Sequence, residues 1–148
     1  MNTEATTGEY MLLFRGTQWD KGLSPQELQQ AMDKVAAWAE GLQGQGKARG
    51  GQPLGAQGRI VSGKKGGFVA DGPFAESKEA IGGYLVLRAD DLNNAVEIAR
   101  SNPMLEYGVT IEVRPVLAEC PVFQRAKDRA GLAHLAGRAD QLLSEAVA

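Results

Sequence analysis

The side chains best suited to chemistry in this sequence are charged residues that interrupt apolar segments. Arg15 ends the run Tyr-Met-Leu-Leu-Phe, and Glu112 and Arg114 alternate with apolar residues, so that both lie on one face of a predicted strand. A buried charge needs a partner. These three residues therefore form either an ion-pair network in a subunit interface or a site where an arginine grips an anionic or carbonyl ligand beside a carboxylate.

A fourth charged residue, Asp71, directly precedes a Gly-Pro pair. An aspartate in that place often accepts hydrogen bonds from backbone N–H groups and fixes the turn. The alternative is a cleft carboxylate that binds a ligand or acts as a general base. Trp19 is either the wall of a pocket or a core or interface residue. We therefore take Asp71 as the candidate catalytic residue and Arg15, Trp19, Glu112 and Arg114 as candidate ligand-binding residues.

Composition argues against several classes of function. The net charge of −2 and the aromatic content of 6% do not favour a nucleic-acid-binding protein. No run of about 18 apolar residues predicts a membrane span, and the start of the chain does not resemble a signal peptide. Cys120 is the single cysteine and His134 the single histidine, and no cluster has metal-ligand spacing. We expect a cytoplasmic protein without metal, cofactor, membrane or nucleic acid.

The elements that must position these residues begin with a strand over Tyr10–Arg15. A helix over Pro25–Gln43 follows, because Ser24 and Glu27 form a capping box around Pro25 at the first helical position. Apolar residues at spacings of three and four predict its inner face: Leu28, Met32, Val35, Ala39 and Leu42.

Glycine-rich sequence then predicts short strands at 47–54, 59–62 and 68–70, with a turn at 63–67. A strand at 83–88 precedes a helix that Asp90 or Asp91 caps and that stops before Pro103. The inner side of this helix is predicted to carry Leu92, Ala95, Val96 and Ala99. A last strand alternates Val109, Ile111 and Val113 with polar residues.

This order of strand, helix, hairpin, strand, helix and strand is the split βαβ pattern of an α+β, ferredoxin-like βαββαβ fold with one antiparallel sheet. Helices cover one face of such a sheet, and a second copy of the chain commonly covers the other. We expect the alternating residues of the last strand, Val109, Ile111 and Val113, to form that uncovered apolar face. After Cys120, apolar residues at helical spacing predict a helical extension: Leu132, Leu135, Ala139, Leu142 and Leu143.

The segment Asp-Gly-Pro-Phe-Ala-Glu-Ser-Lys-Glu at 71–79, followed by Ile-Gly-Gly-Tyr at 81–84, resembles the signature of the DGPF-type YCII-related family. Further segments at 10–16, 50–54 and 113–116 resemble family blocks in the same order. The resemblance implies a homodimeric α/β barrel with clefts near the sheet edges. It also implies acid–base chemistry by a histidine and an aspartate, to which Asp71 corresponds, whereas no histidine precedes Gly131.

Three functions follow from these observations. The first is a homodimeric protein that binds a small molecule or has a regulatory role. The second is a lyase or proton-transfer enzyme that uses Asp71 as base and Arg15 or Arg114 to hold the substrate. The third comes from the resemblance alone: a regulatory partner of an extracytoplasmic-function sigma factor, docked through the tail. We expect a flexible N-terminus over 1–9, the family domain over 10–121 and the helical extension over 122–148.

Overall fold

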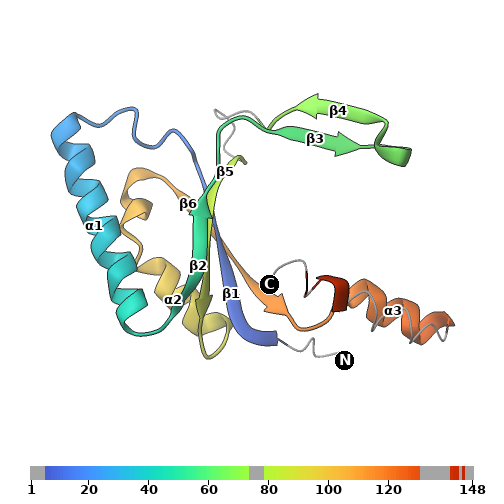
Figure 1. Ribbon diagram of the computed structural model, residues 1–148. Helices are drawn as coiled ribbons and strands as arrows, with labels where there is room; N and C mark the ends of the chain where they lie inside the picture. Colours follow the sequence, from blue (N-terminus) through green and yellow to red (C-terminus); the bar gives the residue numbers. More distant parts are fainter. Residues whose placement is uncertain (1–5, 74–78, 131–140, 144, 146–148) are drawn as a thin grey trace. The chain divides into compact units, whose positions relative to one another are not determined.

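The computed structural model describes residues 6–73, 79–130, 141–143 and 145 of the chain (Figure 1). These residues divide into two units, which are described separately: Gly8–Pro115, and the described parts of Met1–Thr7 and Val116–Ala148. The elements are, in order, β1 (Thr6–Arg15), α1 (Pro25–Gly44), β2 (Ala48–Pro53), β3 (Arg59–Ser62), η1 (Lys64–Gly66), β4 (Phe68–Asp71), β5 (Ile81–Arg88), α2 (Leu92–Arg100), η2 (Pro103–Tyr107), β6 (Thr110–Leu117) and α3 (Pro121–Ala130).

The larger unit contains a four-stranded antiparallel sheet in the order β2-β5-β1-β6. Counting only these four strands with α1 and α2 gives the βαββαβ order and the strand arrangement of a ferredoxin-like fold, as the sequence predicts. Strand β1 pairs with β5 in a register that sets Leu12 opposite Leu85 and Tyr10 opposite Leu87. It begins at Thr6, four residues before the strand start at Tyr10 that the sequence predicts.

Helix α1 starts as the sequence predicts. The backbone N–H of Glu27 donates to Ser24 Oγ at 3.1 Å, and the N–H of Ser24 donates to Glu27 Oε1 at 3.2 Å. This backbone hydrogen bond and the Ser24 side chain hold the pKa of Glu27 below its usual value. The predicted inner face is partly wrong, because Met32 and Ala39 are exposed whereas Ala31 is buried. The inward stripe is Leu28, Ala31, Val35, Trp38 and Leu42.

Helix α2 begins after Asp91, whose carboxylate accepts a hydrogen bond from the backbone N–H of Asn94 at 2.7 Å. Its buried residues are Ala95, Ile98 and Ala99. The prediction that Leu92 and Val96 lie on the inner side is wrong, since both are exposed. The buried stripe therefore includes Ile98, which the prediction omits.

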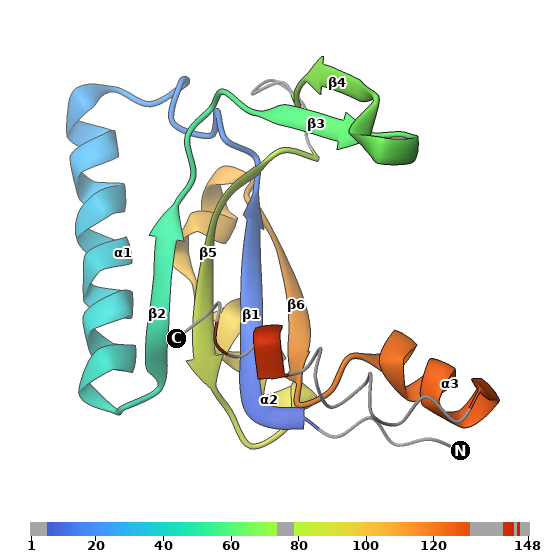
Figure 2. The same cartoon turned by 45° about the vertical axis from the view of Figure 1, so that its right-hand side comes forward.

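The core of this unit lies between the sheet and the two helices, which cover the same sheet face (Figures 1 and 2). Tyr10, Leu12 and Leu87 are its central strand residues, and Ile111 and Val113 pack against them. The expectation that Val109, Ile111 and Val113 form the uncovered face is therefore wrong. They belong to the helix-covered side, and Val109 is buried.

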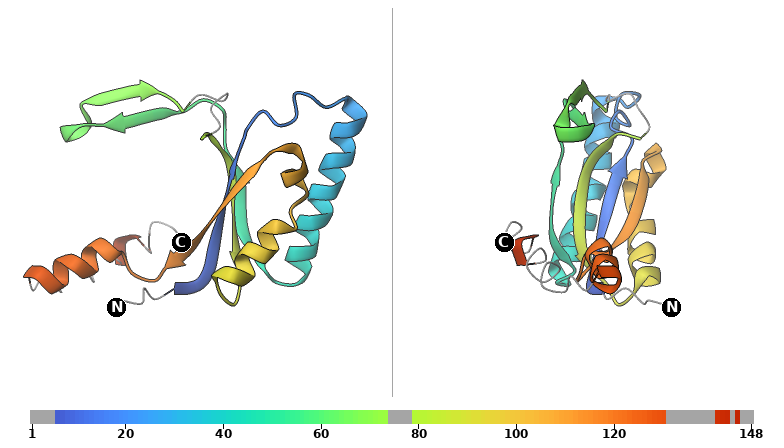
Figure 3. Two further views of the ribbon diagram at one scale, coloured as in Figure 1. Left: turned by 180° about the vertical axis from the view of Figure 1, so that it is seen from behind. Right: turned by 90° about the vertical axis from the view of Figure 1, so that its right-hand side faces the viewer.

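The opposite sheet face carries the residues that alternate with this core. Two apolar cross-strand pairs lie there, Met11 with Val86 and Leu13 with Tyr84. Among the described residues of Gly8–Pro115, no helix lies on this side of the sheet (Figure 3). We call this surface the open sheet face.

Strands β3 and β4 form a separate two-stranded sheet, inserted between β2 and β5. The register sets Ile60 opposite Ala70 and Val61 opposite Val69, and η1 closes the turn. The predicted hairpin is thus confirmed, but it does not join the main sheet. It projects from one end of that sheet on the side away from α1 and α2 (Figures 1 and 3). Residues 58–72 are called the hairpin arm below.

The smaller unit contains α3, which starts at Pro121, where the backbone N–H of Gln124 donates to the carbonyl of Cys120 at 3.1 Å. Of the predicted tail helix, Leu132, Leu135 and Ala139 lie outside the described residues, as does His134. The described helices include none that combines the length and the apolar character of a membrane span.

Candidate functional site

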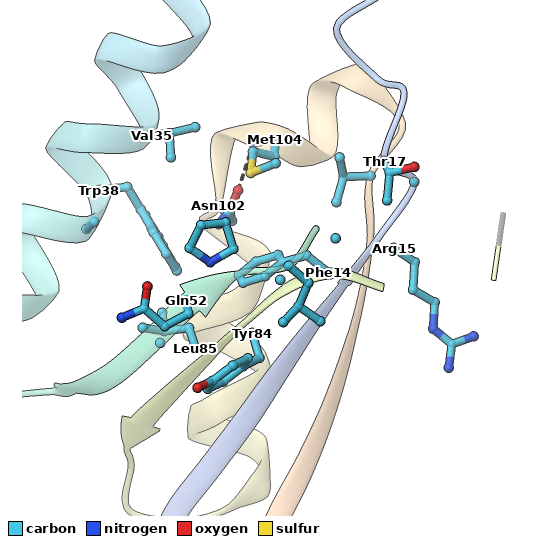
Figure 4. A pocket seen from close by; sticks show the side chains of 18 of the residues that line it. Phe14, Arg15, Thr17, Val35, Trp38, Gln52, Tyr84, Leu85, Asn102 and Met104 are labelled. Carbon is cyan, nitrogen blue, oxygen red and sulfur yellow. Dashed lines mark hydrogen bonds between the residues drawn. The ribbon is translucent and has the colours of Figure 1, made fainter. Parts of the chain in front are cut away.

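A pocket of about 830 Å³ lies between α1 and the helix-covered face of the sheet, within Gly8–Pro115 (Figure 4). Its walls come from several elements: β1 with the loop that follows it, α1, β2, β5, η2 and Val109, the residue before β6. Figure 4 shows Val35 and Trp38 of α1 facing Phe14 of β1 across this space, with Met104 of η2 beside them. Its volume is in the range of ligand-binding cavities, about 300–1,000 Å³.

Glycines of two strands line part of the pocket. Gly50 and Gly51 of β2 and Gly82 and Gly83 of β5 line it without side chains. Gly51 is also required for the pairing of the two strands, because a Cβ atom there would overlap the carbonyl oxygen of Tyr84. The two strands therefore contribute backbone rather than side chains to this part of the pocket wall.

Aromatic rings form the fixed walls. The indole N–H of Trp38 donates to Ser101 Oγ at 2.8 Å, and that hydroxyl donates to the carbonyl of Ile98 at 2.6 Å. This chain of hydrogen bonds holds the ring of Trp38 against the pocket. Trp19 also lines the pocket and contacts Tyr107, with ring centroids 5.5 Å apart. The chain has two tryptophans, and both are pocket residues.

Neutral polar groups complete the lining. Asn102 is 3% exposed, and its Oδ1 accepts a hydrogen bond from the backbone N–H of Met104 at 2.8 Å, which starts η2. Thr17, Gln43 and Gln52 also border the cavity. Amide and hydroxyl groups of this kind orient a ligand through hydrogen bonds without requiring it to carry a charge.

Arg15 borders the pocket, but its guanidinium group points away from it (Figure 4). One guanidinium nitrogen donates to Glu112 Oε1 at 2.7 Å, and another lies 3.4 Å from Glu79 Oε2. Arg15 Nε is buried and has no hydrogen-bond partner among the described residues. The structure thus brings Arg15 and Glu112 together, as the sequence predicts, whereas Arg114 of the same strand is exposed.

A second arginine at the rim is also paired outward. Arg49 of β2 lines the pocket, and its Nε lies 3.6 Å from Glu9 Oε2. Glu9 alternates with the buried Tyr10 on β1, so this contact is on the open sheet face. Neither arginine at the rim therefore directs its charge into the cavity.

Asp71 lies in a different place from the other candidate residues. It lines a second hollow of about 580 Å³ at the base of the hairpin arm, which shares one residue, Ala56, with the pocket. Its carboxylate is 69% exposed and forms an ion pair with Arg59 across the hairpin. The backbone N–H of Gly72 donates to the carbonyl of Gly58 rather than to Asp71, and the next N–H groups, at 74–78, lie outside the described residues.

The sequence reasoning found Trp19 and Arg15 at the pocket but missed Trp38 and Asn102. Trp38 follows Val35 by three residues on α1, so helical spacing could have indicated it. Asn102 precedes Pro103, a pattern typical of a helix start, and its burial is a tertiary effect. The described residues contain no group of three or more His, Cys, Asp or Glu side chains arranged to hold a metal ion.

Two comparisons with known proteins gave a match. A family model for the YCII-related domain matches residues 9–120. Among curated proteins, none matches the sequence significantly. One solved structure that matches is 5-chloro-2-hydroxyhydroquinone dehydrochlorinase (TftG) from Burkholderia phenoliruptrix AC1100 in complex with 2,5-dihydroxybenzoquinone. The match has 15% sequence identity and a TM-score of 0.38, and covers 72% of this chain and 90% of TftG. The family match confirms the resemblance seen in the sequence: this chain belongs to the YCII-related domain family.

Proposed function

We propose that this protein binds a small molecule in the pocket between α1 and the sheet. The observation that carries the proposal is a cavity of about 830 Å³ with fixed aromatic walls, in a unit that otherwise packs its helices closely on the sheet. The pocket is open to solvent on one side, since exposed residues such as Ala39 and Gln52 lie in its lining. The anchored ring of Trp38 gives this open pocket a fixed wall.

The chemistry of the lining supports an uncharged, largely apolar ligand. Both arginines at the rim are engaged outside the cavity, Arg15 by Glu112 and Arg49 by Glu9. An anion in the pocket would lose its hydration without gaining a charged partner, which is costly. A flat neutral molecule could stack on the tryptophan ring and form hydrogen bonds with amide groups such as that of Asn102.

We infer further that the working form is a homodimer. The open sheet face carries the apolar pairs Met11–Val86 and Leu13–Tyr84. An apolar sheet face needs a covering layer, and a second sheet related by a two-fold axis supplies one. The Arg15–Glu112 pair lies on the same face, as expected for an ion pair in the interface between two sheets.

The test uses two matched fluorescent probes. N-phenylnaphthylamine is neutral and apolar, and anilinonaphthalene sulfonate has the same ring skeleton with an added negative charge. Both tryptophans line the pocket, so quenching of intrinsic fluorescence reports on binding there. We expect the neutral probe to bind at least about tenfold more tightly than the sulfonate, a difference of about 1.4 kcal/mol.

A matched pair of variants on α1 locates the binding. Ala39 is exposed but lines the pocket, so Ala39→Phe fills part of the cavity and should abolish quenching by the neutral probe. Ala36 is exposed on the same helix and does not line the pocket, so Ala36→Phe should leave binding unchanged. Equal affinity in both variants would show that the probe binds elsewhere. Tighter binding of the sulfonate would contradict the proposed ligand class.

A further inference from the structure

The hairpin arm is rich in apolar residues, as buried elements are, but it is exposed in the single chain. Every residue of β3 and β4 is exposed. Val61 is 63% exposed and Phe68 71% exposed, and Ile60 and Val69 are also exposed large apolar residues. Such a cluster on one short element differs from the scattered exposed apolar residues of ordinary surfaces. A lone two-stranded hairpin is at best marginally stable in water, so this one needs a packing partner.

Both faces of the hairpin arm are apolar. The cross-strand pair Val61–Val69 lies on one face with the Arg59–Asp71 ion pair. Ile60 and Phe68 lie on the other face. A strand pair with one face toward solvent normally alternates apolar and polar residues. Apolar residues on both faces therefore indicate that the hairpin arm is enclosed from more than one side.

Charge favours a second copy of the chain as the covering surface. The hairpin arm contains Arg59, Lys64, Lys65 and Asp71, a net charge of +2. The whole chain has a net charge of −2, so the rest of it carries −4. A basic arm is thus complementary to an otherwise acidic chain. The arm also projects on the same side of the main sheet as the open sheet face (Figures 1 and 3).

We propose that the hairpin arm reaches over a second copy of this chain and packs its apolar residues against that copy. The inference rests on the homodimer proposed above: when the two open sheet faces meet, each arm projects toward the other subunit. The interface then consists of the two sheets and two exchanged arms. By two-fold symmetry, each arm makes the same contact with the other subunit. One substitution in the arm therefore removes two equivalent contacts from the dimer.

The experiment compares dimer dissociation in the full chain and in surface variants by analytical ultracentrifugation across a dilution series. The double variant Phe68→Ser with Val69→Ser should raise the dimer Kd by at least about tenfold, because it removes interface contacts from both arms. Both side chains are exposed in the single chain, so the variant should still fold. Met32→Ser, at an exposed apolar residue of α1 on the helix layer, is the control and should not change the Kd.

Two further measurements complete the design. Lys64→Glu with Lys65→Glu should weaken the dimer, most strongly at low salt. Amide hydrogens of residues 59–71 should exchange more slowly at high protein concentration, where the dimer predominates.

The outcomes separate this inference from the proposed dimer. A wild-type chain that stays monomeric at every concentration would refute both. A dimer whose Kd is insensitive to the Phe68 and Val69 substitutions, with no concentration-dependent protection of the arm, would refute the arm alone. Protection that is independent of concentration and is lost on deletion of residues 131–148 would assign the arm's partner to the same chain's tail and overturn the inference.

Discussion

Breaking the Arg15–Glu112 pair tests whether these candidate residues have a structural or a ligand-binding role. The two side chains are 27% and 36% exposed, and the contact distance is 2.7 Å. Hydrogen bonds to charged groups contribute about 1.5–3 kcal/mol, whereas exposed ion pairs contribute about 0.2–1 kcal/mol. A half-buried pair lies between these limits, so we expect a coupling energy of about 1–2 kcal/mol. Arg15 Nε already lacks a partner among the described residues, which makes the loss of Glu112 more costly.

The assay is a double-mutant cycle with Arg15→Met and Glu112→Gln, measured by urea unfolding at one protein concentration. Each substitution keeps most of the side-chain volume and removes the charge. A loss of 1 kcal/mol should lower Tm by roughly 2–4 °C in a domain of this size. The control is Glu97→Gln, which breaks a 2.9 Å pair with Arg100 on the exposed surface of α2. That change should cost less than about 0.5 kcal/mol.

Three outcomes of the double-mutant cycle would contradict the expected coupling energy or the structural role of the pair. A coupling energy below about 0.5 kcal/mol would show that the pair does not stabilise the fold. Loss of probe binding in Glu112→Gln with unchanged stability would assign Arg15 and Glu112 to the ligand site. A cost of about 3–5 kcal/mol would instead indicate a fully buried pair, as expected if the dimer encloses it.

Four further predictions concern three single side chains and the C-terminal extension. Ser24→Ala should cost about 1 kcal/mol by loss of the N-cap. The fold lowers the pKa of Glu27, so the ionised Glu27 carboxylate stabilises the protein above the usual carboxyl pKa. This stabilisation is lost as the pH falls through the lowered pKa. Glu27→Gln should therefore reduce the dependence of Tm on acid pH. Asp71→Asn should change stability by less than about 1 kcal/mol and leave probe binding intact, because the Asp71–Arg59 pair is exposed. A fall in ligand affinity at unchanged Tm would instead support the enzyme hypothesis. Deletion from Gln124 onward should leave a folded dimer by circular dichroism and ultracentrifugation, and an unfolded product would refute the predicted domain boundary.

The sequence predicts the elements well where a local signal specifies them. The capping box of Ser24 and Glu27, the Asp91 cap and the glycine-rich turn of the hairpin each depend on residues close in the chain. Which side of an element faces inward depends on its neighbours instead. On α1 the small residues Ala31 and Ala39 allow two adjacent apolar stripes, and tertiary packing selects the one that contains Ala31 and Trp38.

The pocket could not be predicted from spacing alone. Its lining joins residues from Phe14 to Val109, and part of its wall is backbone at glycine positions. Backbone that lines a pocket leaves no signal in the apolar periodicity of a sequence. The enzyme hypothesis combines Asp71 with Arg15 or Arg114. In the structure Asp71 lines a separate hollow at the base of the inserted hairpin, and Arg15 pairs with Glu112.

Strand β1 borders both the pocket and the open sheet face. Its run Tyr-Met-Leu-Leu-Phe is apolar at every position, which is typical of a strand that is covered on both faces. Tyr10, Leu12 and Phe14 face the helices, and Phe14 reaches the pocket. Met11 and Leu13 face the open side, where Arg15 continues the same alternation. Arg15 therefore lies at the edge of the pocket while its charge is on the opposite face. A single strand thus separates the proposed ligand pocket from the proposed subunit contact.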